Sequence, residues 1–191
     1  MYNALYKLPE APYKILEHLA TEAAAEDFWK LIKYNSYDAL SKKNLTFKEK
    51  MSLIWTPKNG AHQENYNIFF TNLIEDAIAE SKSILKIYNY MVQPVDLYKS
   101  AVVFAFDFLF GGTMSLVDYN GIPVNRGDLC AHLLLSVLNG AEIGGVGKLA
   151  LDDTLSRYTG AKTVIGNSKT FTGICLYLGT LMGDAGTETG C

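Results

Sequence analysis

The stretch AVVFAFDFLF, residues 101–110, alternates two sets of side chains and decides how the fold is built. One set is Val102, Phe104, Phe106, Phe108 and Phe110, and the other is Ala101, Val103, Ala105, Asp107 and Leu109. Successive side chains of a β-strand point to opposite faces, so this period of two predicts a strand over 99–110. The charge at Asp107 leaves two interpretations. Its face of the sheet meets solvent or a neighbouring subunit, or Asp107 is a general base with a shifted pKa.

Further strands are predicted before and after this one in the chain. Residues 65–73 and 83–91 share its richness in Ile, Val, Phe and Tyr, which favour strands. Closing strands are predicted over 148–151, 162–166 and 170–182. Together these segments predict an antiparallel sheet from residues 65–110 and 148–182. Residues 74–80 fit either a short helix or an acidic turn.

The residues before the sheet predict helices, from about 11 to 56. Pro12 suits the first turn of a helix, because the N–H that proline lacks would have no partner there. Apolar residues then recur at helical spacing as far as Asn35, and no helix breaker occurs over residues 20–25. A helix is therefore expected to continue through this region.

A capping box marks another helix start. Thr46 and Glu49 are spaced so that each side chain can satisfy the other's free backbone N–H. The apolar face of this helix is predicted to contain Phe47, Met51 and Ile54. Pro57 ends the helix, because it disfavours helical geometry in the residue before it.

One more helix is predicted over 126–138. Asn125 is a good N-cap, and Asp128 places a carboxylate at the positive end of the helix. The predicted buried face consists of Cys130, Leu133, Leu134 and Val137. Asn139-Gly140 is a suitable left-handed stop. The sequence thus predicts an α+β fold, with N-terminal helices followed by an antiparallel sheet with one packed helix.

Composition suggests how the chain is divided. The 191 residues are 49% hydrophobic and 19% charged, which is typical of a globular protein. Of the 16 glycines, only Gly60 precedes residue 111. We therefore expect a helical segment over 1–60, an α+β domain over 61–183 and a flexible tail over 184–191.

Charge and apolar runs exclude some classes of function. The net charge of −3 argues against a dedicated nucleic-acid binder. No apolar run reaches the roughly 18 residues that a membrane span needs. The N-terminus has no basic stretch followed by an apolar one, so we expect assembly in the cytoplasm.

The cysteines and histidines predict neither a disulfide framework nor a metal site. Three cysteines, at 130, 175 and 191, are an odd number without CxxC spacing. The histidines, at 18, 62 and 132, are far apart and have no HxH or HxxxH spacing. We therefore expect no metal ligands and treat Cys130 and Cys175 as small buried apolar residues.

The glycine-rich motif IGGVGK, residues 143–148, imitates a phosphate-binding loop without fitting it. Glu142 stands where the Walker pattern needs glycine, and Leu149 stands where it needs Ser or Thr. The motif also follows a helix, whereas a phosphate loop precedes one. It predicts a flexible or tight loop that leads into a strand, with no cofactor-binding residues.

Two groups of residues remain candidates for a site. Arg126 and Asp128 flank the start of the predicted helix, where they either cap it or form a charged contact between subunits. Asp107, His132 and Cys175 could instead belong to the active site of a small cytosolic enzyme, although only their presence supports that alternative.

Several short motifs carry a family resemblance. They are NRGDL (125–129), the apolar helix ending at Asn139-Gly140, AEIGGVGKL (141–149), and in the N-terminal part LIKYN (31–35), DAL (38–40) and Leu45 to Trp55. With the order of predicted elements, the chain resembles a neck or tail-terminator-type protein of tailed bacteriophages over roughly residues 28–182.

The resemblance implies a structural virion protein with no catalytic residues. Such subunits form a ring, often a hexamer, that ends the tail tube and joins it to the head. The implied partners are other copies of the chain, the tail-tube protein and a neck or connector protein, while DNA passes through without specific binding. The alternatives are another virion part, namely a head-completion or tail-tube subunit with residues 152–166 as a stacking loop, and the small cytosolic enzyme.

Overall fold

The computed structural model describes residues 5–59, 62–72, 82–96, 99–151, 162–165 and 171–183. In this part of the chain, N-terminal helices precede a five-stranded sheet and a long helix packs on the sheet, so the predicted α+β fold is confirmed. The segment 74–80 and the tail 184–191 lie outside the described residues.

The sheet has the strand order β1-β2-β3-β9-β8. Its strands are β1 (Ile68–Phe69), β2 (Ile84–Pro94), β3 (Lys99–Gly111), β8 (Lys162–Ile165) and β9 (Phe171–Gly183). All neighbours are antiparallel except β1, which pairs in parallel with β2. The prediction of a long antiparallel strand over 65–73 is therefore wrong, because the pairing there involves only two residues and runs in parallel.

Four α-helices are described: α1 (Ala11–Thr21), α2 (Glu26–Lys33), α3 (Phe47–Met51) and α5 (Arg126–Leu138). Short 3-10 helices are η2 (Leu8–Glu10), η3 (Ala23–Ala25), η4 (Ala39–Ser41), η5 (Pro57–Asn59), η6 (Gln63–Asn65) and η7 (Gly112–Met114). The expected continuous helix is interrupted, because Glu22 adopts extended geometry with ψ 123°. The α3 helix ends well before Pro57, and Phe47 is 48% exposed rather than on a buried face.

Both predicted helix starts are confirmed. Glu49 N–H donates to Thr46 Oγ1 at 3.3 Å, and Thr46 N–H donates to Glu49 Oε2 at 2.8 Å, as in a capping box. At the start of α5, Asp128 N–H donates to Asn125 Oδ1 at 3.1 Å. The helix ends before Gly140, whose φ of +89° is the left-handed stop that the sequence predicts.

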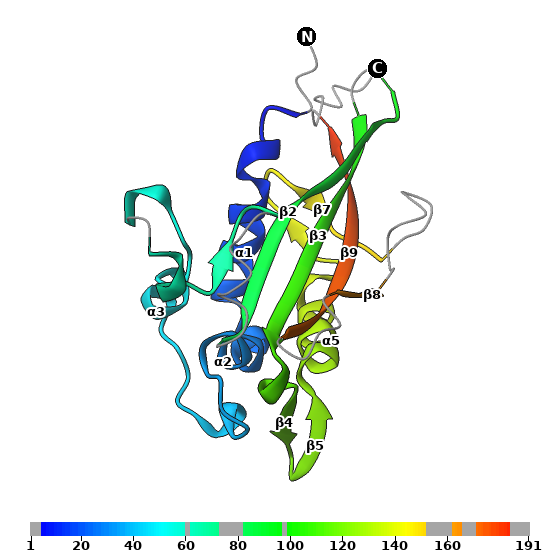
Figure 1. Ribbon diagram of the computed structural model, residues 1–191. Helices are drawn as coiled ribbons and strands as arrows, with labels where there is room; N and C mark the ends of the chain where they lie inside the picture. Colours follow the sequence, from blue (N-terminus) through cyan, green and yellow to red (C-terminus); the bar gives the residue numbers. More distant parts are fainter. Residues whose placement is uncertain are drawn as a thin grey trace.

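Two small hairpins flank α5. They are β4 (Leu116–Tyr119) with β5 (Ile122–Asn125), and β6 (Glu142–Ile143) with β7 (Gly147–Lys148). The first projects at one end of the molecule, opposite the end where β2 turns into β3 (Figure 1). The second lies beyond the C-terminal end of α5.

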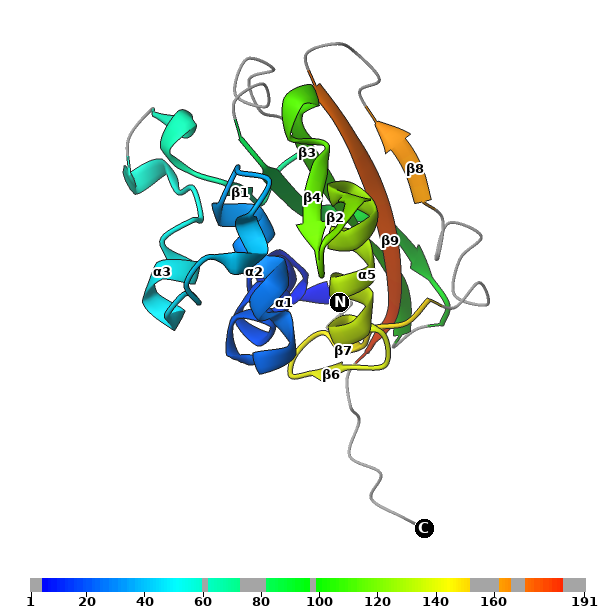
Figure 2. The ribbon, with the colours of Figure 1, turned by 90° about the horizontal axis from the view of Figure 1, so that it is seen from below.

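The core lies between the helices and one face of the sheet. Helices α1, α2 and α5 all pack on this inner face (Figures 1 and 2). The phenylalanines of β3 at 104, 106 and 108 point into it and are at most 1% exposed. Phe108 meets Phe28 of α2 edge to face at 6.0 Å. Each such ring stabilises the fold by roughly 1.5–3 kcal/mol. The hydrophobic core contains residues from both 1–60 and 61–183. The expected division of the chain into these two parts stays a prediction.

Candidate functional site

The side chain of Arg126 is the centre of a polar junction inside the molecule. It is 0% exposed although it stands at the first position of α5. Its Nε donates to Met114 O at 2.9 Å, and its Nη1 donates to Leu31 O and Tyr34 O at 3.0 Å each. Nη2 donates to Ser36 O at 2.8 Å. The guanidinium therefore joins the start of α5 to η7 and to the end of α2.

This geometry corrects the expectation of a contact between subunits through Arg126. The side chain is enclosed by its own chain and cannot reach a neighbour. Burial lowers the pKa of Arg126, but a guanidinium stays protonated in proteins, and the carbonyl oxygens stabilise its charge. Asp128 is exposed, and a role between subunits stays a prediction for this residue.

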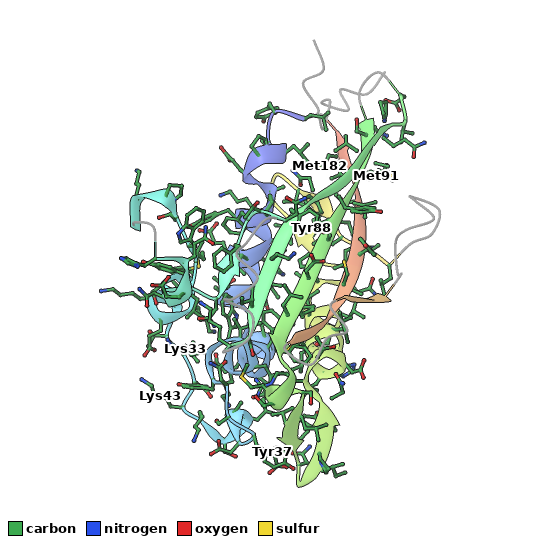
Figure 3. All side chains as sticks on the ribbon, viewed as in Figure 1. Lys33, Tyr37, Lys43, Tyr88, Met91 and Met182 are labelled. Atoms are coloured by element: carbon green, nitrogen blue, oxygen red, sulfur yellow. The ribbon has the colours of Figure 1, made fainter. Side chains whose placement is uncertain are left out.

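A second polar cluster lies on the outer face, which we define as the face of β2, β3 and β9 opposite α1, α2 and α5. Lys86 Nζ lies 3.0 Å from Asp107 Oδ2, and both side chains are largely buried. Tyr88 Oη donates to the same oxygen at 3.2 Å, and Figure 3 shows Tyr88 on the sheet. Burial and the Asp107 carboxylate raise the pKa of Tyr88. Asp107 is thus held by a lysine and a tyrosine.

The candidate enzyme residues are only partly brought together. Cys175 of β9 is the register partner of Asp107 on β3. Burial, with a hydrogen bond to Asp107, raises the pKa of Cys175 to about 12, so its sulfur is a thiol rather than a nucleophilic thiolate. His132 is exposed on α5, which packs on the other face of the sheet. These residues form no Cys–His pair.

Aromatic rings bridge the outer face above this cluster. Tyr90 of β2 and Tyr177 of β9 approach to 4.8 Å between ring centroids. Between them runs β3, where Ala105 is 0% exposed and is the register partner of Tyr88 on one side and of Tyr177 on the other. Three exposed apolar residues lie toward the end of the molecule where β2 turns into β3, and we call them the arm patch. They are Tyr90, Val95 and Leu181, which are 42%, 59% and 45% exposed.

The projecting β4–β5 hairpin carries one exposed apolar residue at its base, Leu116, and one beside its turn, Ile122. Its turn is Asn120-Gly121, with φ of +55° and +80°, as a two-residue hairpin turn requires. Leu116 is 50% and Ile122 is 61% exposed, and register places them on opposite faces of the hairpin. Asp118 N–H donates to Tyr37 O at 2.9 Å, and Tyr37 lies at this end of the molecule (Figure 3).

A groove opens on the side of the N-terminal helices. It has a volume of about 610 Å³ and is lined by Tyr13, Met51, Ser52, Ile54, Thr56, Tyr66 and Phe70. Tyr13 of α1 meets Phe70 edge to face at 6.3 Å. Sequence reasoning missed the groove, because its walls come from α1, the end of α3 and the residues around β1.

The glycine-rich motif forms the tight β6–β7 hairpin, so the predicted loop is confirmed. Gly145 and Gly147 have φ of +83° and +97°. A Cβ on Gly147 would lie 2.9 Å from Thr180 Oγ1 and 3.0 Å from a backbone oxygen. Glycine is therefore required here by backbone geometry and by close packing against β9.

Among the described residues, no three His, Cys, Asp or Glu side chains gather in a way that could hold a metal ion. None of the described helices is long and apolar enough to cross a membrane.

The fold and these surfaces define an α+β protein with exposed apolar side chains at two ends and a groove on its side. Residues 25–180 match the YomW family, and the chain belongs to that family. The family name is associated with bacteriophages, which points to a phage-encoded protein. No curated protein matches the chain.

Proposed function

We propose that this protein is a structural component of a tailed phage virion. It forms a closed ring at the neck or tail end, terminates the tail tube there and joins it to the head. The protein performs no catalysis and needs no cofactor for this role. Membership of a phage-associated family supports a phage setting, and the resemblance of the sequence to tail-terminator-type proteins supports the position in the virion.

The observation that carries the proposal is the distribution of exposed apolar surface. The arm patch and the β4–β5 hairpin tip lie at opposite ends of the molecule, and the groove lies on its side (Figure 1). Ring subunits contact their two neighbours through different patches. A ring that also joins a tube to a head needs surfaces along its axis. A chain with several separate contact surfaces fits these requirements.

The proposed ring implies three kinds of protein partner. Other copies of the chain, six in a hexameric ring, provide the lateral contacts, and the tail-tube protein and a neck or connector protein bind above and below. The net charge of −3 suits a channel wall that repels DNA phosphates, so that DNA passes without specific binding. The chain assembles in the host cytoplasm and remains in the virion.

Electron microscopy of phage lacking the gene tests the proposal. A missing terminator leaves tails of irregular, excessive length that carry no heads, and complementation with the parent gene restores normal particles. Tails of normal length beside unfilled or leaking heads would instead favour a head-completion protein. Absence of any tail tube would favour a tube subunit. Normal, infectious particles without the protein would refute a structural role.

A further inference from the structure

We propose that Lys86 and Asp107 condense into an isopeptide bond, an amide between the two side chains that links β2 to β3 covalently. The inference concerns a modification of the folded chain itself. It goes beyond the proposed function and does not depend on whether the chain forms a ring. Three features of the pair support it: its register, its burial and the incomplete hydrogen bonding of the Asp107 carboxylate.

The sheet holds the two reacting groups together. Lys86 and Asp107 are direct register partners on the antiparallel strands β2 and β3, so their side chains project from the outer face side by side. Lys86 Nζ lies 3.0 Å from Asp107 Oδ2. The carbon that the amine must attack, Cγ, is bonded to this oxygen, so only a small movement brings the two atoms together. Such positioning gives the reaction the advantage of an intramolecular step.

The surroundings of the pair largely exclude water. The side chain of Lys86 is 12% exposed and that of Asp107 is 6% exposed. The next register pair on the outer face, Ile84 with Leu109, belongs to a small buried apolar cluster. On the other side of β3 lies Cys175, which is 2% exposed. Because amide formation releases water and hydrolysis consumes it, a dry site favours the amide. The low dielectric also favours proton transfer from the ammonium to the carboxylate.

The ion pair leaves one polar atom of Asp107 without a partner. Oδ2 faces Lys86 Nζ and accepts from Tyr88 Oη at 3.2 Å, whereas Oδ1 is buried and has no hydrogen-bond partner among the described residues. An unpaired buried oxygen is costly, and the desolvation of two buried charges can exceed their mutual attraction. An amide is neutral, so the condensation removes both charges from the interior.

The step balances without any further reactant. One proton passes from the Lys86 ammonium to Asp107 Oδ2, which leaves a neutral amine and a carboxylic acid. The nitrogen then attacks Cγ, and the N–Cγ bond forms. The Cγ–Oδ2 bond breaks as Oδ2 receives a second proton from the nitrogen and departs as water. Oδ1 remains as the amide oxygen, and nothing is oxidised or reduced.

Tyr88 is placed to carry the protons of this step. Its hydroxyl donates to Asp107 Oδ2, the oxygen that leaves, and can pass a proton to it while accepting one from the nitrogen. Burial and the Asp107 carboxylate raise the pKa of Tyr88, so the hydroxyl stays protonated and available as a donor. Lys86 Nζ also donates to Asn72 O at 3.3 Å, a hydrogen bond that the N–H of an amide can keep.

The bond fastens the middle of the sheet. It closes a covalent loop from residue 86 to residue 107 that includes the end where β2 turns into β3. The two strands then stay joined even where their hydrogen bonds open. Like a disulfide, such a link also restricts the unfolded chain and so favours the folded one.

The intact mass of the full chain, measured in denaturant after reduction of the cysteines, tests the inference. The parent should weigh one water, about 18 Da, less than its sequence requires. Lys86→Met should have its full sequence mass. Lys99→Met is the matched control, because Lys99 is an exposed lysine of the same sheet, and this variant should keep the loss.

A peptide map of the parent locates the bond without depending on whether a variant folds. Trypsin should not cleave after Lys86, because an acylated lysine has lost the charge that the protease recognises. Lys86 and Asp107 should therefore occur in one cross-linked peptide. In newly synthesised, pulse-labelled chain, Tyr88→Phe leaves the ion pair in place and should slow the loss of water at least roughly 10-fold.

The outcomes separate this inference from the proposed function. A parent chain with its full sequence mass would overturn the isopeptide bond. A loss of water that persists in Lys86→Met would also overturn it, because that result indicates a succinimide. Equal rates in the parent and Tyr88→Phe would remove the role given to Tyr88. None of these results bears on the ring, which the phage experiments test.

Discussion

Replacing Arg126 by methionine removes the charge that joins α5 to the N-terminal helices. Four hydrogen bonds of 2.8–3.0 Å disappear, and the carbonyl oxygens that accepted them are left in an interior where Arg126 was 0% exposed. Hydrogen bonds to a charged group contribute about 1.5–3 kcal/mol each. Because the guanidinium no longer has to be desolvated, we expect a net loss of about 3–5 kcal/mol. That is a large part of the 5–15 kcal/mol by which domains are usually stable.

Urea unfolding followed by tryptophan fluorescence measures this loss. Trp29 is fully buried and its emission should shift when the core opens. With a urea dependence of about 2 kcal/mol/M, the midpoint should fall by about 1.5–2.5 M. Arg126→Lys should lose roughly half as much free energy of unfolding, because an ammonium group with three donors cannot reproduce the planar arrangement of the guanidinium donors. Lys48→Met, at an exposed position, is the control and should unfold like the parent. An Arg126→Met midpoint equal to the parent's would refute the structural role.

Three further outcomes follow from the core and the glycine hairpin. Leu134→Ala should lower the free energy of unfolding by about 2–5 kcal/mol, because Leu134 is 0% exposed on α5; an unchanged thermal melt would contradict its placement. Gly147→Ala should destabilise by more than about 1 kcal/mol in denaturant titrations, because φ is +97° and the new Cβ would lie 2.9 Å from a hydroxyl oxygen. Gly144→Ala, with nothing within 4 Å of its Cβ position, should be close to neutral. Burial raises the pKa of Cys130 and Cys175 to about 12, so the reactive thiolate forms only toward that pH. In a variant without the C-terminal cysteine, iodoacetamide at pH 8 should leave the folded chain unmodified and alkylate it after unfolding; fast labelling of the native chain would show that these thiols are accessible.

Local patterns predicted the parts of the fold that local physics determines. The period of two over residues 101–110 identified β3, because alternation is a property of a strand itself. Asn125 and the Thr46–Glu49 pair marked helix starts, because a cap acts within four residues. The β4–β5 hairpin was missed, although the Asn120-Gly121 pair is a recognised signal for its turn.

Features that depend on distant segments could not be predicted from the sequence. The parallel pairing of β1 with β2 depends on where the chain returns to the sheet. Arg126 looked like a surface charge because three of its acceptors lie 90 to 95 residues earlier in the chain. Asp107 looked isolated because Lys86 and Tyr88 belong to the neighbouring strand. In each case the partner is set by topology, which no short motif encodes.

The central claim, that this chain forms a ring where the tail meets the head, is tested most directly by locating it in the virion. Antibody-labelled virions imaged by electron microscopy, followed by an averaged reconstruction of the labelled region, show both position and symmetry. The account predicts one labelled ring per particle, of fixed subunit number, at the neck end of the tail tube. Label along the whole tube, label confined to another part of the particle, or no label in purified virions would contradict it.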